Sequence, residues 1–256
     1  MDLKMKDKVA LVTGSSSGIG RATAIVFAQE GAKVVVSGRN EERCKAVVDE
    51  IKAAGGEASY FVADVTVEEE VKALVDFTVQ TYGRLDYAFN NAGISGRGSG
   101  KSVHQAAADL YRETYETNCL AVATCMRYEI PYMLENGKGA IVNNCSANSL
   151  AVNKYGSVYA HAKYAVYGLT RAAAMDYADQ NIRINGVGPG ITDTPMIEGL
   201  MKSNPEKVKL LMTQIPDQKI GDPENVANTV VFLCSDLADH INAELVCVDG
   251  GQNAVL

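Results

Sequence analysis

Tyr159 and Lys163 are four residues apart in a segment with helical character. In a helix this spacing puts both side chains on one face, one turn apart. A free tyrosine has a pKa of about 10, so proton transfer near neutral pH needs a neighbour that stabilises the phenolate, and an ammonium group can do so. The pair indicates general acid and base chemistry, but the same spacing is also typical of an ordinary helix face.

A serine stands thirteen residues before that tyrosine, at the end of the apolar run GAIVNNCS. We expect this run to be a strand, so Ser146 would lie at the carboxyl edge of a sheet. A hydroxyl there can donate a hydrogen bond to a substrate oxygen. A capping or turn serine is an equally open interpretation.

The stretch TGSSSGIG, residues 13–20, permits two chemistries. Gly14, Ser16 and Gly18 match the G-x-S-x-G elbow of hydrolases, whereas Gly14, Gly18 and Gly20 match a turn that lets backbone amides approach a phosphate. Only thirteen residues precede Gly14, too few for the upstream loop that an elbow needs. A phosphate-binding turn is therefore favoured, although a plain strand-to-helix turn also uses glycine and serine.

A second stretch, SGRGSGKS at residues 95–102, comes close to the phosphate loop of nucleotide triphosphatases. Gly100, Lys101 and Ser102 match that loop, but Ser95 stands where its first glycine belongs. We therefore expect a solvated loop beside the site and no triphosphatase activity.

Composition excludes several classes of protein. The net charge is −7 and no basic run interrupts the chain, which argues against nucleic-acid binding. The six cysteines are scattered and do not cluster with the three histidines, so we expect neither disulfides nor a metal site. The N-terminus lacks a signal-peptide pattern and no apolar run is long enough to span a membrane. A cytoplasmic protein is expected.

Short β-branched runs alternate with longer amphipathic segments along the chain. This alternation predicts an α/β fold, a doubly wound parallel sheet with helices on both faces, in a single domain over residues 1–256. The expected strands are residues 8–13, 33–37, 58–63, 85–90, 139–146, 183–187 and 244–248. The expected helices are residues 19–30, 40–54, 68–82, 105–135 with an interruption near Pro131, 155–180 and 223–234.

Two stretches are irregular in pattern, residues 94–103 and residues 192–216, and both follow expected strand ends. Ligands bind at the carboxyl ends of strands in open α/β sheets, so both are candidate walls of the site. The second stretch is a candidate substrate lid with apolar residues Met196, Ile197, Leu200, Met201, Leu210, Leu211 and Met212. An amphipathic helix packed on the core is the alternative.

These motifs together resemble the short-chain dehydrogenase/reductase family in its one-domain form. The resemblance rests on TGSSSGIG, NNAG at residues 90–93, Asn118, Ser146, YAHAK at residues 159–163, PG at residues 189–190 and VDGG at residues 248–251. It covers nearly the whole chain in the family's order. Each piece is weak alone, but the joint pattern is specific.

The resemblance implies roles for the chemistry-bearing residues. Tyr159 would be the general acid in ketone reduction and the base in alcohol oxidation. Lys163 would favour its phenolate and hold the nicotinamide ribose. Ser146 would position the reacting oxygen, and Asn118 would support a water-linked proton path.

The resemblance also implies a nicotinamide dinucleotide lying across the sheet. Asp64 would meet the adenine, and Ile191 and Thr194 would meet the nicotinamide end. The full set of expected cofactor contacts is Gly14, Ser16, Ser17, Gly18, Ile19, Gly20, Arg39, Asp64, Val65, Asn91, Ala92, Gly93, Tyr159, Lys163, Pro189, Gly190, Ile191 and Thr194.

The end of the second expected strand bears on the choice between NAD and NADP. An acidic residue there would bind the ribose hydroxyls of NAD, and an arginine suits the extra phosphate of NADP. The chain has no carboxylate at this point and has Arg39, which favours NADP(H) over NAD(H). The family's other basic position, within the glycine turn, is Ser17 here, and Arg39 is also typical of a solvated helix start.

The sequence therefore predicts an NADP(H)-preferring oxidoreductase that interconverts a secondary alcohol and a ketone. The apolar lid favours a bulky hydrophobic substrate such as a hydroxysteroid, and sugars, small ketones and acyl-carrier substrates are the alternatives. A non-catalytic dinucleotide-binding redox sensor or scaffold is the competing function, but it would not need the proton-transfer residues. The resemblance further implies a homotetramer built partly on the helices at residues 105–135 and 155–180.

Overall fold

Seven strands form one sheet in the order β3-β2-β1-β4-β5-β6-β7, and every neighbouring pair is parallel. The computed structural model describes residues 3–96, 100–203, 205–213 and 215–255. The strand order reverses between β1 and β4, and ligands of open α/β sheets bind at such a switch point. The strands are β1 (Val9–Val12), β2 (Lys33–Gly38), β3 (Glu57–Val62), β4 (Tyr87–Asn90), β5 (Gly139–Asn144), β6 (Ile182–Pro189) and β7 (Leu245–Val248).

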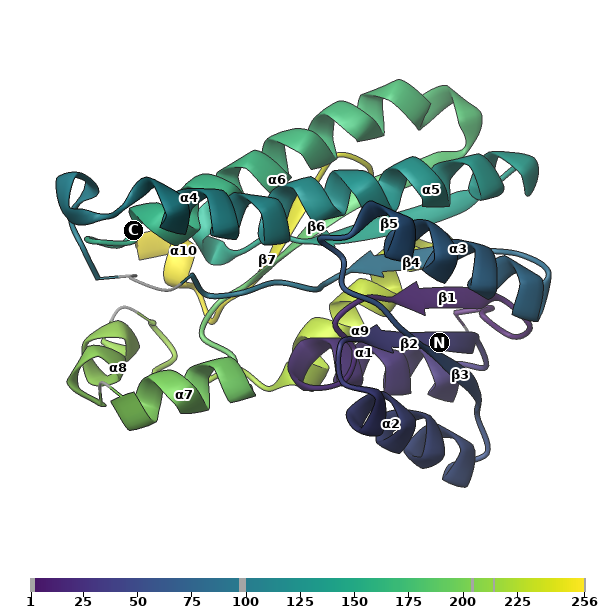
Figure 1. Ribbon diagram of the computed structural model, residues 1–256, viewed down its shortest axis with the longest axis horizontal. Helices are drawn as coiled ribbons and strands as arrows, with labels where there is room; N and C mark the ends of the chain where they lie inside the picture. The colour runs from purple at the N-terminus through teal and green to yellow at the C-terminus, as the bar shows by residue number, and fades with distance from the viewer. Residues whose placement is uncertain (1–2, 97–99, 204, 214, 256) are drawn as a thin grey trace.

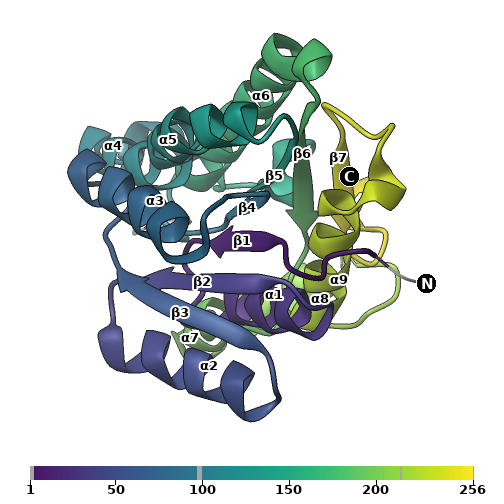
Figure 2. The same ribbon diagram turned by 90° about the vertical axis from the view of Figure 1, so that its right-hand side faces the viewer.

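Helices cover both faces of the sheet, as Figures 1 and 2 show. One hydrophobic cluster joins the sheet to α1 (Gly18–Gln29), α2 (Glu41–Ala53) and α9 (Pro223–Cys234). A second cluster joins the other face to α3 (Glu68–Tyr82), α5 (Ala121–Glu135) and α6 (Ser157–Tyr177). The predicted doubly wound parallel fold is therefore confirmed.

Local sequence signals explain several helix ends. Asn40 precedes α2, and its Oδ1 accepts a hydrogen bond from the backbone N–H of Arg43 at 2.9 Å. Helix α3 begins with three glutamates, which favour the positive end of the helix dipole. It ends at Gly83, whose φ of 80° lies in the left-handed region that glycine adopts without cost.

The helical region expected at residues 105–135 is built differently from the prediction. It comprises a short 3-10 helix η1 (Val103–Gln105), α4 (Ala108–Tyr115), a π-helical segment η2 (Glu116–Leu120) and α5. The predicted interruption near Pro131 is wrong, because Pro131 lies inside α5 without ending it. Packing of α5 on the sheet and α3 outweighs the single hydrogen bond that proline cannot donate.

Two further element boundaries differ between the sequence prediction and the structure. Strand β5 ends at Asn144, so Ser146 lies beyond the strand and caps the short 3-10 helix η3 (Ala147–Ser149). The helix expected at residues 155–180 begins only at residue 157, because Tyr155 has a left-handed φ of 65°. Its last turn is the 3-10 helix η4 (Ala178–Gln180).

The stretch at residues 192–216 is not irregular, contrary to prediction. It contains α7 (Pro195–Ser203) and α8 (Pro205–Met212), each opened by a proline, which is favourable in a first helical turn. Residues 204 and 214 of this stretch, and residues 97–99 of the stretch that resembles a triphosphatase loop, lie outside the described residues. A short helix α10 (Gln252–Val255), absent from the sequence prediction, follows β7.

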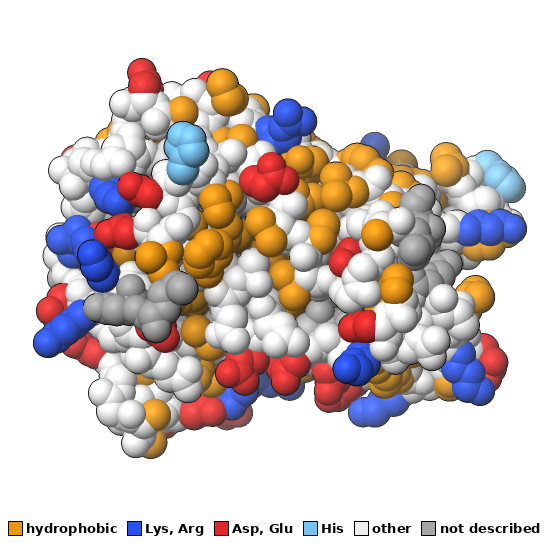
Figure 3. Space-filling view, turned by 180° about the vertical axis from the view of Figure 1, so that it is seen from behind, with side chains coloured by type: hydrophobic (Ala, Val, Ile, Leu, Met, Phe, Trp, Pro, Cys, Tyr) orange, Lys and Arg blue, Asp and Glu red, His pale blue; other side chains and the backbone are white. Residues whose placement is uncertain are grey.

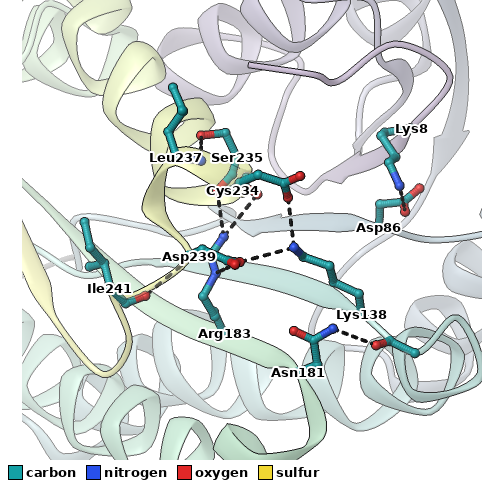
Figure 4. A network of polar contacts seen from close by, with 12 residues as sticks. Lys8, Asp86, Lys138, Asn181, Arg183, Cys234, Ser235, Leu237, Asp239 and Ile241 are labelled. Atoms are coloured by element: carbon teal, nitrogen blue, oxygen red, sulfur yellow. Dashed lines mark hydrogen bonds and ion pairs between the residues drawn. The ribbon is translucent and has the colours of Figure 1, made fainter. Parts of the chain in front are cut away.

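A polar network closes the amino-terminal edge of the sheet (Figure 4). Arg183 of β6 is 7% exposed, and its guanidinium donates to the carbonyls of Leu233 at 2.7 Å and Ser235 at 2.9 Å, where α9 ends. Lys138 lies 3.1 Å from Asp239, which also neighbours the guanidinium. The network holds α9 on the sheet at the edge opposite the strands' carboxyl ends. No helix within the described ranges is long and apolar enough to cross a bilayer.

Candidate active site

The carboxyl ends of the central strands open into one cleft with a volume of about 1690 Å³. Of the residues predicted for the site, Asn118 and Gly20 do not line this cleft. The others do: Gly14, Ser16, Ser17, Gly18, Ile19, Arg39, Asp64, Val65, Asn91, Ala92, Gly93, Ser146, Tyr159, Lys163, Pro189, Gly190, Ile191 and Thr194.

The glycine turn between β1 and α1 has no room for side chains at Gly14 and Gly20. A Cβ on Gly14, where φ is 62°, would lie 2.7 Å from the Cα of Ala92. A Cβ on Gly20 would lie 2.5 Å from the carbonyl oxygen of Gly14. Gly18 has a left-handed φ of 55° and faces Thr194. The turn therefore presents bare backbone at the amino end of α1, a geometry that fits the pyrophosphate of a dinucleotide.

Asn91 joins three strand ends behind this turn. Its Nδ2 donates to the carbonyls of Thr13 at 3.0 Å and Gly14 at 3.1 Å. Its Oδ1 accepts from Nδ2 of Asn144 at 2.9 Å. These hydrogen bonds hold the turn and the ends of β4 and β5 in fixed positions. Asn91 thereby positions the neighbouring residues that line the cleft.

Ser146, Tyr159 and Lys163 all line the cleft. The Oγ of Ser146 accepts a hydrogen bond from the backbone N–H of Asn148 at 3.1 Å, which leaves its own proton available to donate. Lys163 is 3% exposed, and its Nζ donates to the carbonyl of Asn144 at 2.5 Å. The same Nζ lies 5.7 Å from the centre of the Tyr159 ring, so the predicted helix-face pair does face the cleft together.

Asn118 lies behind this group, in the π-helical segment η2. Its side chain is 1% exposed and makes two hydrogen bonds with the backbone of Ile94, each 2.8 Å long. A Cβ on Gly93 would lie 2.9 Å from the Asn118 Oδ1. The side chain therefore fixes the loop that follows β4 with one of its two N–H groups and one of its two oxygen lone pairs.

Two arginines and an aspartate also line the cleft. Arg39 is paired with Asp64 at 3.7 Å, and the Arg39 side chain is 73% exposed. Partial burial raises the pKa of Asp64, but hydrogen bonds from Thr66 and the charge of Arg39 outweigh this effect and lower the pKa below its ordinary value. Arg43, one turn into α2, is the second arginine, and no carboxylate stands at Gly38.

No histidine lines the cleft among the residues that the structure describes. His161 lies on α6 with its ring 5.1 Å from that of Tyr111, and its Nδ1 is 3.2 Å from the carbonyl of Ser157. Ser16 therefore has no imidazole base beside it, which is unfavourable for the hydrolase interpretation. The described residues contain no group of three histidine, cysteine or carboxylate side chains that could hold a metal ion.

Sequence patterns left many cleft-lining residues unmarked, and Arg43, Tyr155 and Gln252 are examples. Arg43 was detectable in principle, since it lies one helical turn after Arg39. Tyr155 and Gln252 reach the cleft only through the fold, from the loop before α6 and from the turn after β7. No local motif marks either residue.

Comparisons with known proteins match this chain to dehydrogenases and reductases. A family model described as enoyl-(acyl carrier protein) reductase matches residues 14–253. Cyclohexanol dehydrogenase of Acinetobacter sp. (strain SE19) is 44% identical over 99% of this chain and 98% of its own.

Two solved structures extend the likeness to the fold. A structure of 7α-hydroxysteroid dehydrogenase complexed with NADH and 7-oxo glycochenodeoxycholic acid has a TM-score of 0.89 at 35% identity, covering 98% of this chain and 96% of that one. A structure of an actinorhodin polyketide ketoreductase variant with NADPH has a TM-score of 0.90 at 32% identity, covering 96% and 97%.

Proposed function

The chain belongs to the short-chain dehydrogenase/reductase family of NAD(P)-dependent oxidoreductases, and we propose that it interconverts a secondary alcohol and a ketone with NADP(H) in preference to NAD(H). One observation carries the proposal. A single cleft runs from the arginine pair Arg39 and Arg43, over the bare glycine turn, to Ser146, Tyr159 and Lys163. Its volume of about 1690 Å³ exceeds that of a typical small-molecule site and suits a dinucleotide with a substrate beside it.

The proton transfers belong to Tyr159. In the reductive direction its hydroxyl donates a proton to the ketone oxygen, and in the oxidative direction its phenolate takes the alcohol proton. The nicotinamide group, when bound, supplies or accepts the hydride. Ser146 donates its free hydroxyl proton to the same substrate oxygen, which holds that oxygen in place as charge develops on it.

Lys163 supports Tyr159 by its charge. Its ammonium group has three donors and spends one on the Asn144 carbonyl, so others remain for a ribose hydroxyl. Near the ring of Tyr159 the positive charge stabilises the phenolate in a site where Lys163 itself is buried.

Asn118 is a positioning residue in this proposal. Its side chain spends one N–H and one oxygen lone pair on Ile94, so its second N–H, its second lone pair and its main-chain carbonyl are the groups with which Asn118 would support a water-linked proton path. The wider turns of a π-helical segment change the backbone hydrogen bonding there, and such segments recur at functional sites.

The cofactor preference rests on charge. Arg39 and Arg43 both line the cleft, without a carboxylate at Gly38 that would repel a ribose phosphate. Asp64 now holds Arg39, and a phosphate on the adenine ribose would be a stronger partner for the guanidinium than one carboxylate.

Fluorescence titration with NADPH and NADH tests this preference. The wild type should bind NADPH more tightly, and Arg39→Leu should weaken NADPH binding by about 10-fold while leaving NADH binding unchanged. Arg112→Leu, which removes an exposed arginine of α4, is the matched control. Tighter binding of NADH by the wild type would contradict the preference.

The substrate proposed is a bulky, mainly apolar alcohol or ketone such as a hydroxysteroid, under a lid at residues 192–216. Support comes from Met196, Ile197 and Leu210, which line the cleft from α7 and α8. Met196 is 45% exposed and Leu210 is 63% exposed, as expected of residues awaiting a partner. The cytoplasmic location and the homotetramer stay predictions.

A further inference from the structure

Gln252, the first residue of α10, is a buried carboxamide on the wall of the cleft. Gln252 is 3% exposed, and the Oε1 of its side chain is buried without a hydrogen-bond partner. No hydrogen bond joins its side chain to any other described residue. Figure 1 shows α10 at the same end of the molecule as α7 and α8.

The turn before Gln252 is packed against two parts of the substrate end. A Cβ on Gly250 would lie 2.6 Å from Oδ1 of Asp217, in the segment that leads away from α8. A Cβ on Gly190, at the end of β6, would lie 2.8 Å from the Cα of Asp249. Gln252 is therefore held between the base of the lid and the strand end expected to meet the nicotinamide.

An unpaired carboxamide at this place needs an explanation. Burying an amide without a hydrogen bond costs free energy, and an apolar side chain of equal length would avoid that cost. Most buried polar groups in native proteins have partners, and those without one often await a ligand or water. Gln252 lines the cleft, so its missing partner can come from a bound molecule.

We propose that Gln252 binds a second oxygen function of the substrate. The reacting oxygen is held by Ser146 and Tyr159 in the proposed function, on which this inference rests, so Gln252 must address a different atom. The buried Oε1 needs a donor, so a hydroxyl satisfies it, whereas a carbonyl can accept only from the Nε2 of the same carboxamide. Asn153, also on the cleft wall, adds another buried and unpartnered oxygen. The substrate class is therefore a diol, a hydroxyketone or a diketone.

The test compares ketones that differ only in the second oxygen. Cyclohexanone, 4-hydroxycyclohexanone and 1,4-cyclohexanedione are reduced by the wild type and by Gln252→Met, whose side chain has similar length without polar atoms. The wild type should have a higher kcat/KM for the two oxygenated ketones. Gln252→Met should lower these two values by about 10-fold and leave that of cyclohexanone unchanged.

Two controls keep the result interpretable. Gln180→Met makes the same exchange at an exposed residue of η4, at the far edge of the sheet, and should change none of the three values. Cofactor binding by Gln252→Met should match the wild type, which shows that the variant is folded. Gln252→Asn, which keeps the amide on a shorter side chain, should give intermediate values for the oxygenated ketones.

The outcomes separate the two proposals. Equal effects of Gln252→Met on all three ketones, or no effect on any, would overturn the role of Gln252 and leave the proposed function standing. A wild type that reduces neither these three ketones nor a bulky ketosteroid with either nicotinamide cofactor would contradict the proposed function and remove the basis of this inference.

Discussion

Tyr155 has a backbone conformation that its side chain disfavours. Its φ of 65° lies in the left-handed region, which costs a non-glycine residue about 1–2 kcal/mol. The ring is 47% exposed and lies 5.0 Å from Nζ of Lys154, and the Tyr155 carbonyl accepts from the N–H of Gly100 at 3.0 Å. Because Tyr155 lines the cleft, the conformation helps to set where this aromatic residue lies on the cleft wall.

The cost at Tyr155 predicts an order of stabilities. Asparagine tolerates the left-handed region and β-branched residues do not. Tyr155→Asn should raise the free energy of unfolding by roughly 0.5–1 kcal/mol, and Tyr155→Val should lower it by about 1 kcal/mol or more. Urea unfolding measures both. Tyr164→Asn, at an exposed tyrosine of α6, should give no gain, and an equal gain there would mean that backbone conformation is not the cause.

Helix α5 buries a carboxyl group in the core. Glu129 is fully buried, and its Oε2 accepts from Nδ2 of Asn90 at 3.1 Å while its Oε1 has no partner. Burial raises the pKa of Glu129 from 4.5 to about 7, although the hydrogen bond from Asn90 opposes this shift. The same Asn90 amide donates to Asn143 of β5, so the carboxyl belongs to a polar cluster that ties α5 to the sheet.

The raised pKa predicts a stability that falls as pH rises. Between about pH 4.5 and 7 the folded chain keeps the Glu129 proton and the unfolded chain loses it, so stability decreases across this window and levels off above it. Glu129→Gln removes the effect. Its free energy of unfolding relative to the wild type should rise across the window by up to about 3 kcal/mol. A difference that does not vary between pH 5 and 8 would contradict the assignment.

The last carbonyl groups of helix α9 accept hydrogen bonds from the side chain of Arg183. The guanidinium satisfies groups that the helix leaves unpaired at its end, and the Arg183 side chain is buried (Figure 4). Arg183→Met should lower the free energy of unfolding by about 2–4 kcal/mol, and Arg183→Lys should lower it less, because one ammonium group can reach fewer carbonyls. Urea unfolding provides the measurement. Unchanged cofactor binding is expected, since the network lies opposite the cleft.

Helices and strands were predictable where the sequence signal is local. The prediction failed where contacts between distant residues decide the structure. Buried β-branched runs and terminal glycines such as Gly83 located the strands and most helices. The contact between Asn118 and Ile94 was not predictable, because its two hydrogen bonds join residues that are distant in sequence. Gln252 was missed for a similar reason, since only the packing of its turn on Asp217 brings it to the cleft.

The whole molecule presents two apolar faces. Helices α4, α5 and α6 lie together along one side (Figure 1), and Tyr115, Leu120 and Tyr164 are each more than 40% exposed there. The opposite view, in Figure 3, shows apolar side chains across the middle of another face. Edge strand β7 has half-buried apolar residues, and Phe232 of α9 is 37% exposed. In the predicted homotetramer, each two-fold axis would pair one of these faces with its copy on another subunit.

Leu120→Glu tests whether the apolar face formed by α4, α5 and α6 is a contact between subunits. A two-fold contact would bring the new carboxylates of both subunits into one apolar interface, so the assembly should fall from four subunits to fewer. Light scattering gives the mass, and cofactor titration checks that the subunit stays folded. A wild type of monomeric mass, or a variant that remains a tetramer, would contradict this use of the face.

The central claim is that Tyr159 transfers the proton in a nicotinamide-dependent ketone reduction. The most direct measurement compares wild type and Tyr159→Phe for ketone reduction, followed by the loss of NADPH absorbance, with NADPH affinity measured on the same samples. We expect kcat to fall by at least about 100-fold in Tyr159→Phe while NADPH affinity is nearly unchanged. Undiminished turnover in Tyr159→Phe would contradict the mechanism, and NADPH binding by the wild type without turnover of any ketone would favour a sensor.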